Sequence, residues 1–333
     1  MSLWASGPRS DLPFLPNFSQ LSDRVWRVMG LNPGKFTLQG TNTYLVGTGN
    51  RKVLIDCGDG HPDYVPLLIE SLKSIHPEAY LSDILISHCH KDHWGGLDSI
   101  MVSELNKQQT IQVHKFPFLA ENKLFKYFMG TFPASVVPHD LVDNQVFVVD
   151  EQVHIRVIHT PGHAKDHCAF YLEEEDTVFT ADCILGHGSV AFEDLTEYMS
   201  SLNRIRSLNP SRLYPGHGQV VEDAIDKVDQ YLSMRIAKEK QIIDVMLRTK
   251  QPMTPEDIVQ AMDNKKEYHK HLMTVVVRNV GLHLIKLYFD GKVEMIDAEL
   301  FQQKTGEDPY DNNNIYSILD QKWHYIGPEK HKL

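Results

Sequence analysis

The apolar residues of this chain fall into short runs that alternate with amphipathic stretches over the first two thirds of its length. Runs typical of β-strands occupy residues 24–29, 40–47, 52–57, 83–87, 145–149, 153–159, 169–172 and 177–180. Helical spacing of Val65, Leu68 and Leu72 predicts a helix over 62–75, and a second helix is expected over 195–208. The pattern therefore predicts an α/β fold whose chemistry lies in the loops at the strand ends.

The last third of the chain has a different, mainly helical pattern. One long helix is expected over 221–250, a second after Thr254-Pro255-Glu256, and a third through Val277 and Leu287, followed by a short strand at 292–295. Three helices and a hairpin are typical of a winged helix, which could bind substrate, pack against the sheets or mediate dimer contacts. The expected organisation is an N-terminal tail (1–21), a main domain (22–235), a winged-helix-like domain (236–297) and a loosely held, Asn-rich C-terminal tail (298–333).

Length and charge limit the classes of protein to which this chain can belong. Its 333 residues can bury a large core, and no apolar run approaches the length that crosses a bilayer, so no membrane partner is expected. The net charge of −11 argues against broad nucleic-acid affinity, although residues 235–297 carry eleven Lys or Arg against nine Asp or Glu. That segment is either a basic patch or an ordinary solvated helical surface.

The most informative motif is the run His88-Cys89-His90-Lys91-Asp92-His93, which directly follows a predicted strand. Imidazoles and a carboxylate at this density are donors that zinc and similar dications collect. Residues two apart in an extended segment face the same side, so His88 and His90 are expected to share one ion while Asp92 and His93 turn toward a second. The remaining donors lie in three turns: Thr160-Pro161-Gly162-His163, Thr180-Ala181-Asp182-Cys183 and Tyr214-Pro215-Gly216-His217.

These motifs, in the order HxHxDH, GH, D and GH, resemble those of the metallo-β-lactamase superfamily of hydrolases. The resemblance implies an αββα metallo-β-lactamase sandwich over about residues 22–235, with a metal site at the edge between its two sheets. It implies further that Asp182 bridges two ions. The other ligands are then divided between the ions: His88, His90 and His163 on one, and Asp92, His93 and His217 on the other.

Two ions at such a site would supply the chemistry without a Ser-His-Asp set. A pair of zinc ions, with manganese or iron as alternatives, can share a hydroxide and grip both the attacking and the leaving oxygen. Metal coordination brings the pKa of the water to about 7, so that no side-chain base is needed. Asp92 and Asp182 are the expected catalytic carboxylates, because Asp182 would bridge the ions and Asp92 would help to orient the hydroxide.

Two further residues are candidates for supporting roles. Asp56 ends an apolar strand, where a free carboxylate is costly to bury, so we expect it to accept a hydrogen bond from a metal-bound imidazole; the alternative is a turn cap. His167, four residues after His163, could contact substrate or protonate a leaving group. The four cysteines form no Cys-x-x-Cys pair and are expected to be core thiols in a reducing compartment.

Motifs outside the ligand set narrow the resemblance: Asn32-Pro33-Gly34, the run TLQGTNTYLVGTG at 37–49, Cys183-Ile184-Leu185-Gly186, Phe192-Glu193-Asp194-Leu195 and Tyr214-Pro215-Gly216-His217-Gly218. They are similar to those of the β-lactamase-like protein 2 family, metal-dependent endoribonucleases that act on single-stranded RNA in mitochondria. This resemblance implies RNA as the substrate and the mitochondrial matrix as the location. The chain departs from the family at Ala181, where glycine is usual, and at Ala164, where threonine is usual.

Other functions and locations remain open from the sequence. A glyoxalase II-like thioester hydrolase could use the same site, because the same nucleophile attacks a carbonyl carbon. A non-catalytic binding scaffold is a third hypothesis, although such proteins usually lose ligands and all seven are present here. The first residues lack a secretory signal and make a weak mitochondrial transit peptide, so a cytoplasmic location is the alternative. We expect a monomer or a homodimer.

Overall fold

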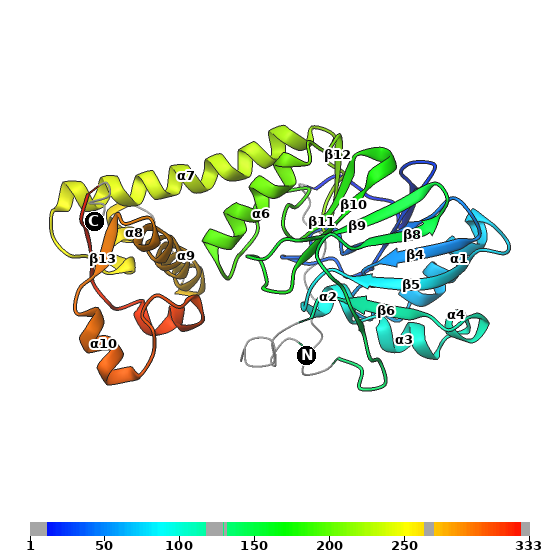
Figure 1. The fold of residues 1–333 in the computed structure, drawn as a ribbon, viewed down its shortest axis with the longest axis horizontal. Helices are drawn as coiled ribbons and strands as arrows, with labels where there is room; N and C mark the ends of the chain where they lie inside the picture. Colours follow the sequence, from blue (N-terminus) through cyan, green and yellow to red (C-terminus); the bar gives the residue numbers. More distant parts are fainter. Residues whose placement is uncertain (1–11, 118–128, 130–131, 263–269, 328–333) are drawn as a thin grey trace. The chain divides into compact units, whose positions relative to one another are not determined.

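The structure is a computed structural model that describes residues 12–117, 129, 132–262 and 270–327 (Figure 1). Contacts between Cα atoms divide the chain into two compact units. The first consists of Met1–Phe192 with Ser200–Asp229, and the second of Glu193–Met199 with Gln230–Leu333. Both β-sheets of the first unit come from the two thirds of the chain in which the sequence predicts strands, and the second unit is mainly helical.

A seven-stranded sheet forms one half of the first unit, and its strands lie side by side in chain order. The strands from β1 to β4 are antiparallel, and those from β4 to β7 are parallel. Phe18 in β1 lies opposite Val28, so the segment expected to be an N-terminal tail contributes an edge strand. The strands are β1 (Phe18–Gln20), β2 (Val25–Met29), β3 (Asn42–Val46), β4 (Arg51–Ile55), β5 (Tyr80–Ile86), β6 (Gln112–Lys115) and β7 (His139–Asp140).

A five-stranded sheet with the order β12-β11-β10-β9-β8 forms the other half. Its pairs are antiparallel except for β11 and β12, which run parallel. Eight strands of the two sheets confirm the predicted runs to within a few residues at each end, whereas β1, β6, β7 and β12 were not predicted because they are short. The second sheet comprises β8 (Val146–Asp150), β9 (Val153–His159), β10 (Cys168–Leu172), β11 (Thr177–Ala181) and β12 (Arg212–Pro215).

Alternation along the strands separates two layers of core. Leu54 in β4 packs on the helix side of the seven-stranded sheet, with residues of α1 (Tyr64–Ile75), α3 (Leu97–Val102) and α4 (Glu104–Gln108). Its neighbour Val53 faces the other way and packs with Phe170 and Phe179 of the second sheet. Two sheets face to face, with helices outside the first, are the layers that the αββα prediction requires.

The helix α6 (Leu195–Ser207) contributes to the outer layer next to the second sheet. Its bounds confirm the helix predicted over 195–208. In the part of α6 that belongs to the first unit, Ser201 Oγ donates a hydrogen bond to Pro161 O at 2.7 Å. Arg204 donates to His159 O at 2.9 Å, where β9 ends. These bonds hold the helix against the loop that follows β9.

The second unit contains α7 (Ala224–Thr249) from Gln230 onwards, then α8 (Pro255–Met262), α9 (Lys270–Phe289) and β13 (Val293–Met295). These elements confirm the three helices and the short strand expected from the sequence. The partner of β13 is not an adjacent strand, however, but β14 (Trp323–Tyr325), with Met295 opposite Trp323. The residues between these two strands, 296–322, form helices and not a tight turn. The hairpin expected for a winged helix is therefore absent from the described residues.

The expectation of a loosely held tail after Asp297 is wrong. This segment forms α10 (Ala298–Thr305), a 3-10 helix (Asn312–Ile318) and β14, and it buries Phe301, Ile318 and Trp323. The segment is polar and rich in Asn overall, and these three buried apolar residues are too widely spaced to give the periodic pattern of a helix or a strand. No helix of the described residues is both long and apolar enough to cross a membrane.

Candidate metal centre

All seven predicted ligands come together in the first unit, in loops that follow the ends of strands. The run after β5 supplies four of them, including the start of α2 (Lys91–Trp94), and the loops after β9, β11 and β12 supply one each. The structure arranges them in two groups, within each of which the ligand atoms lie within 4.8 Å of one another. The groups are His88, His90, His163 and Asp182, and Asp92, His93 and His217.

Three imidazole nitrogens converge in the first group. His90 Nδ1 lies 2.9 Å from His88 Nε2 and 3.0 Å from His163 Nε2. Burial, together with the neighbouring rings, holds the pKa of His88 well below its usual value and lowers the pKa of His90 to about 3. Neutral rings whose nitrogens converge in this way are suited to a metal ion, which requires deprotonated nitrogen.

The second group mixes imidazoles with carboxylates. His217 Nε2 lies 3.1 Å from Asp92 Oδ2, and His93 Nε2 lies 3.5 Å from the same oxygen. Burial alone would lower the pKa of His217, but Asp182 and Asp92 outweigh it and raise this pKa to about 10. Positive charge at this position is therefore favoured by the two carboxylates, as it would be for a bound cation. The Asp92 side chain is 26% exposed, so the group is open to solvent on this side.

Asp182 lies between the two groups. Its Oδ1 is 3.3 Å from His217 Nε2 and 3.5 Å from His93 Nε2, whereas its Oδ2 is 3.7 Å from His163 Nε2. One oxygen therefore faces each group. The preceding Ala181 has a φ of +41°, in the left-handed region that favours glycine, which accounts for the glycine usual in the family at this position.

The structure shows why glycine precedes His217. A Cβ on Gly216 would stand 2.7 Å from Asp182 Oδ1 and 3.0 Å from His93 Cε1. The loop after β12 can approach the bridging carboxylate this closely only without a side chain at this position.

Asp56 lies behind the ligands, buried, at the end of β4. It accepts a hydrogen bond from His93 Nδ1 at 2.7 Å, the contact predicted for it from the sequence. The same carboxylate accepts from the Ser87 backbone N–H at 2.8 Å and from the Ser87 hydroxyl at 2.9 Å. Ser87 Oγ lies 2.9 Å from His88 Nδ1. One carboxylate therefore positions one imidazole in each group.

Sequence reasoning missed Ser87. The one available signal is its position, because it is a hydroxyl residue between a buried strand and the first ligand. Backbone carbonyls position two further rings: His163 Nδ1 lies 2.7 Å from Ala191 O, and His217 Nδ1 lies 3.3 Å from Gly40 O. With Nδ1 engaged in this way, Nε2 is left to face the centre.

His167 is fully buried behind the first group and lines no open surface. Its ring centroid lies 5.1 Å from that of His88, and its Nδ1 lies 2.8 Å from Thr160 Oγ1. This position does not suit the substrate contact or leaving-group protonation considered from the sequence, because either role needs access to the open side. The four cysteines are buried thiols that form no disulfide with one another, and neither ligand group of the described residues includes one.

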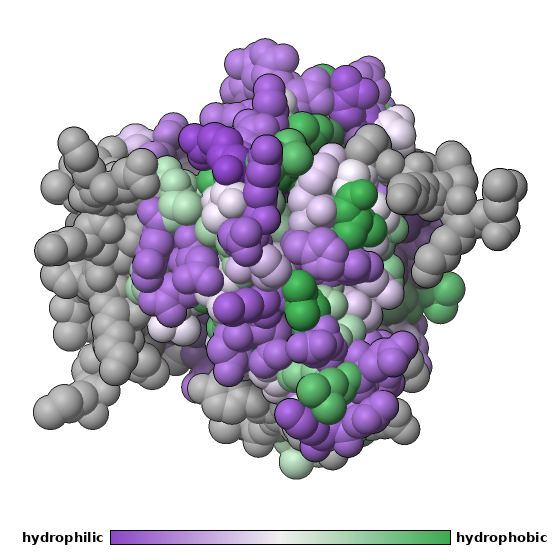
Figure 2. All heavy atoms as spheres, turned by 90° about the vertical axis from the view of Figure 1, so that its left-hand side faces the viewer, coloured by the Kyte–Doolittle hydropathy of each residue, from purple (hydrophilic) through white to green (hydrophobic). Residues whose placement is uncertain are grey.

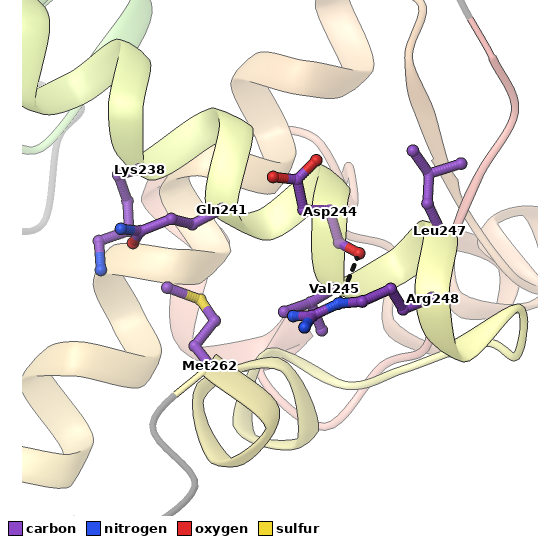
Figure 3. A pocket seen from close by; sticks show the side chains of 7 residues that line it. All are labelled: Lys238, Gln241, Asp244, Val245, Leu247, Arg248 and Met262. Carbon is purple, nitrogen blue, oxygen red and sulfur yellow. Dashed lines mark hydrogen bonds between the residues drawn. The ribbon is translucent and has the colours of Figure 1, made fainter.

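A hollow of about 510 Å³ in the second unit lies between α7 and α8 (Figure 3). Lys238 and Arg248 line it, but so does Asp244, whose backbone oxygen accepts from Arg248 Nε at 3.2 Å. Figure 2 shows one face of the molecule, where hydrophilic side chains predominate and hydrophobic ones stand apart from one another. The described lining thus carries charges of both signs.

Comparisons with known proteins agree with this geometry. The family description that matches residues 36–217 reads Metallo-beta-lactamase superfamily. The chain is 38% identical to a Beta-lactamase-like protein 2 homolog of Drosophila melanogaster over 85% of its own length and 94% of the relative. A homolog of the same name in Caenorhabditis elegans is also 38% identical, over 85% of this chain and 90% of the relative.

A different activity is named for another relative. An atrochrysone carboxyl ACP thioesterase of Cryptosporiopsis is 37% identical over 74% of this chain and 70% of the relative. Among solved structures, a beta-lactamase domain protein from Burkholderia ambifaria matches with a TM-score of 0.72 at 17% identity, over 95% of this chain and 96% of that one, and so supports the fold. The chain therefore belongs to the metallo-β-lactamase superfamily of hydrolases, and two of its relatives that align over most of the chain are Beta-lactamase-like protein 2 homologs.

Proposed function

We propose that this chain binds two metal ions and cleaves single-stranded RNA at internal phosphodiester bonds. The observation that supports two ions is the position of Asp182, with one oxygen facing each group of imidazoles. The ligand assignment is the one implied by the family resemblance: His88, His90 and His163 for one ion, Asp92, His93 and His217 for the other, and Asp182 shared.

When bound, two ions would activate a water molecule for attack and neutralise negative charge that develops on the substrate. The chain's own residues prepare the site for this chemistry. Asp182, Asp92 and the adjoining Asp56 bring three negative charges to the centre, fewer than the four positive charges of two divalent ions, and this balance favours an anionic substrate. Asp56 and Ser87 fix the orientation of His93 and His88, which keeps the ligand set rigid while substrate exchanges.

Coverage of the relatives favours the Beta-lactamase-like protein 2 family, for which the resemblance implies RNA as substrate, over the thioesterase. Identity alone does not discriminate, because it is 38% to the Drosophila Beta-lactamase-like protein 2 homolog and 37% to the Cryptosporiopsis thioesterase. The alignment spans 94% of the first relative but only 70% of the second. Thioester hydrolysis stands as the second candidate function, because the name of that relative states it.

A side-by-side assay separates the two activities. An end-labelled single-stranded oligoribonucleotide and lactoyl-glutathione would each be incubated with the metal-loaded protein and with an Asp182→Asn variant of nearly equal size. We expect internal RNA fragments from the unaltered protein and at least about 100-fold slower cleavage by the variant. Intact RNA with consumed thioester would overturn the proposal in favour of the second candidate.

Metal analysis tests the number and kind of ions. Imidazole-rich ligands favour zinc, and manganese or iron are the alternatives that we retain. We expect two equivalents of metal per chain after purification under metal-replete conditions. Less than one equivalent would contradict the two-ion site and would favour a non-catalytic binding scaffold.

We further propose a mitochondrial matrix location, on the family resemblance alone. Expression of the full chain with a C-terminal tag, followed by fractionation and protease protection, would test it. A tag found wholly in the cytosolic fraction would contradict this location and favour the cytoplasmic alternative.

A further inference from the structure

The loop between β2 and β3 presents an aromatic side chain to solvent. Phe36 is 81% exposed, whereas Leu38, two residues later, is buried. The Nζ of the neighbouring Lys35 lies 5.6 Å from the centroid of the Phe36 ring. An exposed phenyl ring gives up the free energy that its burial would provide, and Phe36 belongs to neither core layer of the sandwich. A ring held in this position is available to a ligand.

Hydrogen bonds hold the loop in one conformation below this tip. Asn32 is buried, and its side-chain oxygen accepts from the Thr41 backbone N–H at 2.8 Å while its amide donates to Thr41 Oγ1 at 2.9 Å. The Gly34 N–H donates to Leu38 O at 3.1 Å and closes a small hairpin. A ring on a braced hairpin loses little conformational entropy when a ligand binds.

The base of this loop is attached to a proposed metal ligand. Gly40 O lies 3.3 Å from His217 Nδ1, and the next residue, Thr41, forms a β-bridge with His217. Asn42 N then donates to Gly216 O at 2.7 Å. Phe36 is four residues from Gly40, so their Cα atoms can be at most about 14 Å apart. A short length of single-stranded RNA could therefore reach from Phe36, at the tip of the loop, to the metal centre.

We propose that Phe36 stacks on a base of single-stranded RNA next to the cleaved bond and that Lys35 contacts an adjacent phosphate. This inference rests on the proposed function. An exposed aromatic ring next to a cation suits the binding of single-stranded nucleic acid, because each base offers a face for stacking and each phosphate carries a negative charge. Leu31, Pro33 and Gln39 of the same loop border a hollow of about 580 Å³, which leaves room beside the hairpin for a neighbouring base, although Asp63 and Glu70 in its lining would repel a phosphate.

Substitutions at Phe36 test the stacking. The metal-loaded full chain would be compared as Phe36→Ala, Phe36→Leu and Phe36→Trp, with Phe289→Ala as the control because Phe289 is also largely exposed but lies in the second unit. We expect the KM for RNA cleavage to rise about 5- to 100-fold in the Ala and Leu variants, with kcat changed less, and to stay near that of the unaltered protein in the Trp and control variants. An unchanged KM in Phe36→Ala, or an equal rise in Phe289→Ala, overturns the inference.

Binding without turnover separates this inference from the proposed function. A phosphorothioate-linked oligoribonucleotide that carries 2-aminopurine reports stacking by quenching of its fluorescence, whether or not the protein cleaves RNA. Quenching that is lost in Phe36→Ala and kept in Phe36→Trp supports the inference even if no cleavage is found. Normal cleavage with no Phe36-dependent quenching overturns the inference and leaves the proposed function intact. For Lys35→Gln, the slope of log affinity against log salt should fall by about 0.7, and an unchanged slope contradicts the phosphate contact.

Discussion

The Ser87 hydroxyl donates to the Asp56 carboxylate at 2.9 Å and lies at the same distance from His88 Nδ1. The Asp56 carboxylate accepts directly from His93 in the second group. Through the Ser87 hydroxyl it is also linked to His88 in the first group. The two proposed ion sites therefore share one support as well as one bridge. A change at Ser87 should loosen the first group and leave the hydrogen bond from His93 to Asp56 in place.

Replacing Ser87 with alanine tests this support. We expect the zinc affinity of the first group to fall about 10- to 100-fold, the usual loss for a second layer of hydrogen bonds around a metal site, and that of the second group to change less. Competition with a chromophoric chelator measures both affinities. Ser87→Thr, which keeps the hydroxyl, is the control and should stay within a few fold of the unaltered protein. Equal affinities in Ser87→Ala and the unaltered protein would show that the hydroxyl does not position His88.

A methyl group on Gly216 should disturb the centre without unfolding the chain. In Gly216→Ala the Cβ would meet Asp182 Oδ1 at 2.7 Å and His93 Cε1 at 3.0 Å, so the bridging carboxylate must move. We expect about 1–3 kcal/mol of lost stability from this overpacking and the loss of one equivalent of bound metal. Urea unfolding and metal analysis measure the two effects.

Gly49→Ala is the matched control for that substitution. A Cβ on Gly49 would meet nothing within 4 Å, so stability and metal content should both stay unchanged. Full metal content in Gly216→Ala would mean that the loop after β12 moves away from Asp182 at little cost.

The convergence of the ligands could be predicted from the sequence because each motif has a pattern that stands out by itself. His88 to His93 follow a buried strand, and His163, Asp182 and His217 each stand in a short turn. Asp56 was predicted on the cost of burying its charge, and its carboxylate does meet His93. Ser87 carries no such signal, because a single serine after a strand is most often an ordinary turn residue.

Long-range pairing accounts for most of what the sequence did not reveal. The partner of β13 lies beyond α10 and a 3-10 helix, and no local pattern links Met295 with Trp323. The strands β6 and β12 are four residues each, too short for period-two alternation to be recognised. The exposed ring of Phe36 could not be distinguished from a core phenylalanine before its solvent exposure was known.

Proton release should distinguish the two ion sites. The pKa of His217 is raised to about 10 by Asp182 and Asp92 against the opposing effect of burial, and the nearby carboxylates raise the pKa of His93 in the same way. Burial lowers the pKa of His90 to about 3 instead. Below pH 10, protons therefore compete with metal in the second group, and its affinity should fall as pH falls, whereas the first group stays deprotonated.

Titration calorimetry at pH 6 and pH 7.5, in buffers with different ionisation enthalpies, counts these protons. We expect the first equivalent of zinc to bind with almost no proton release, and the second to release up to two protons and to weaken steeply at the lower pH. Equal proton release in both steps would contradict the separate charge states of the two groups.

Trp323 should contribute to the stability of the second unit, although its segment has the composition of a tail. Its side chain is fully buried, and its backbone N–H donates to Met253 O at 2.8 Å while it pairs with Met295. We expect Trp323→Ala to lower the free energy of unfolding by about 3–5 kcal/mol, the usual cost of deleting a large buried ring. Tyr316→Ala, at an aromatic residue that is 63% exposed in the same segment, should cost less than about 1 kcal/mol. Urea unfolding measures both, and a cost for Trp323→Ala as small as the control's would restore the interpretation of residues 298–333 as a tail.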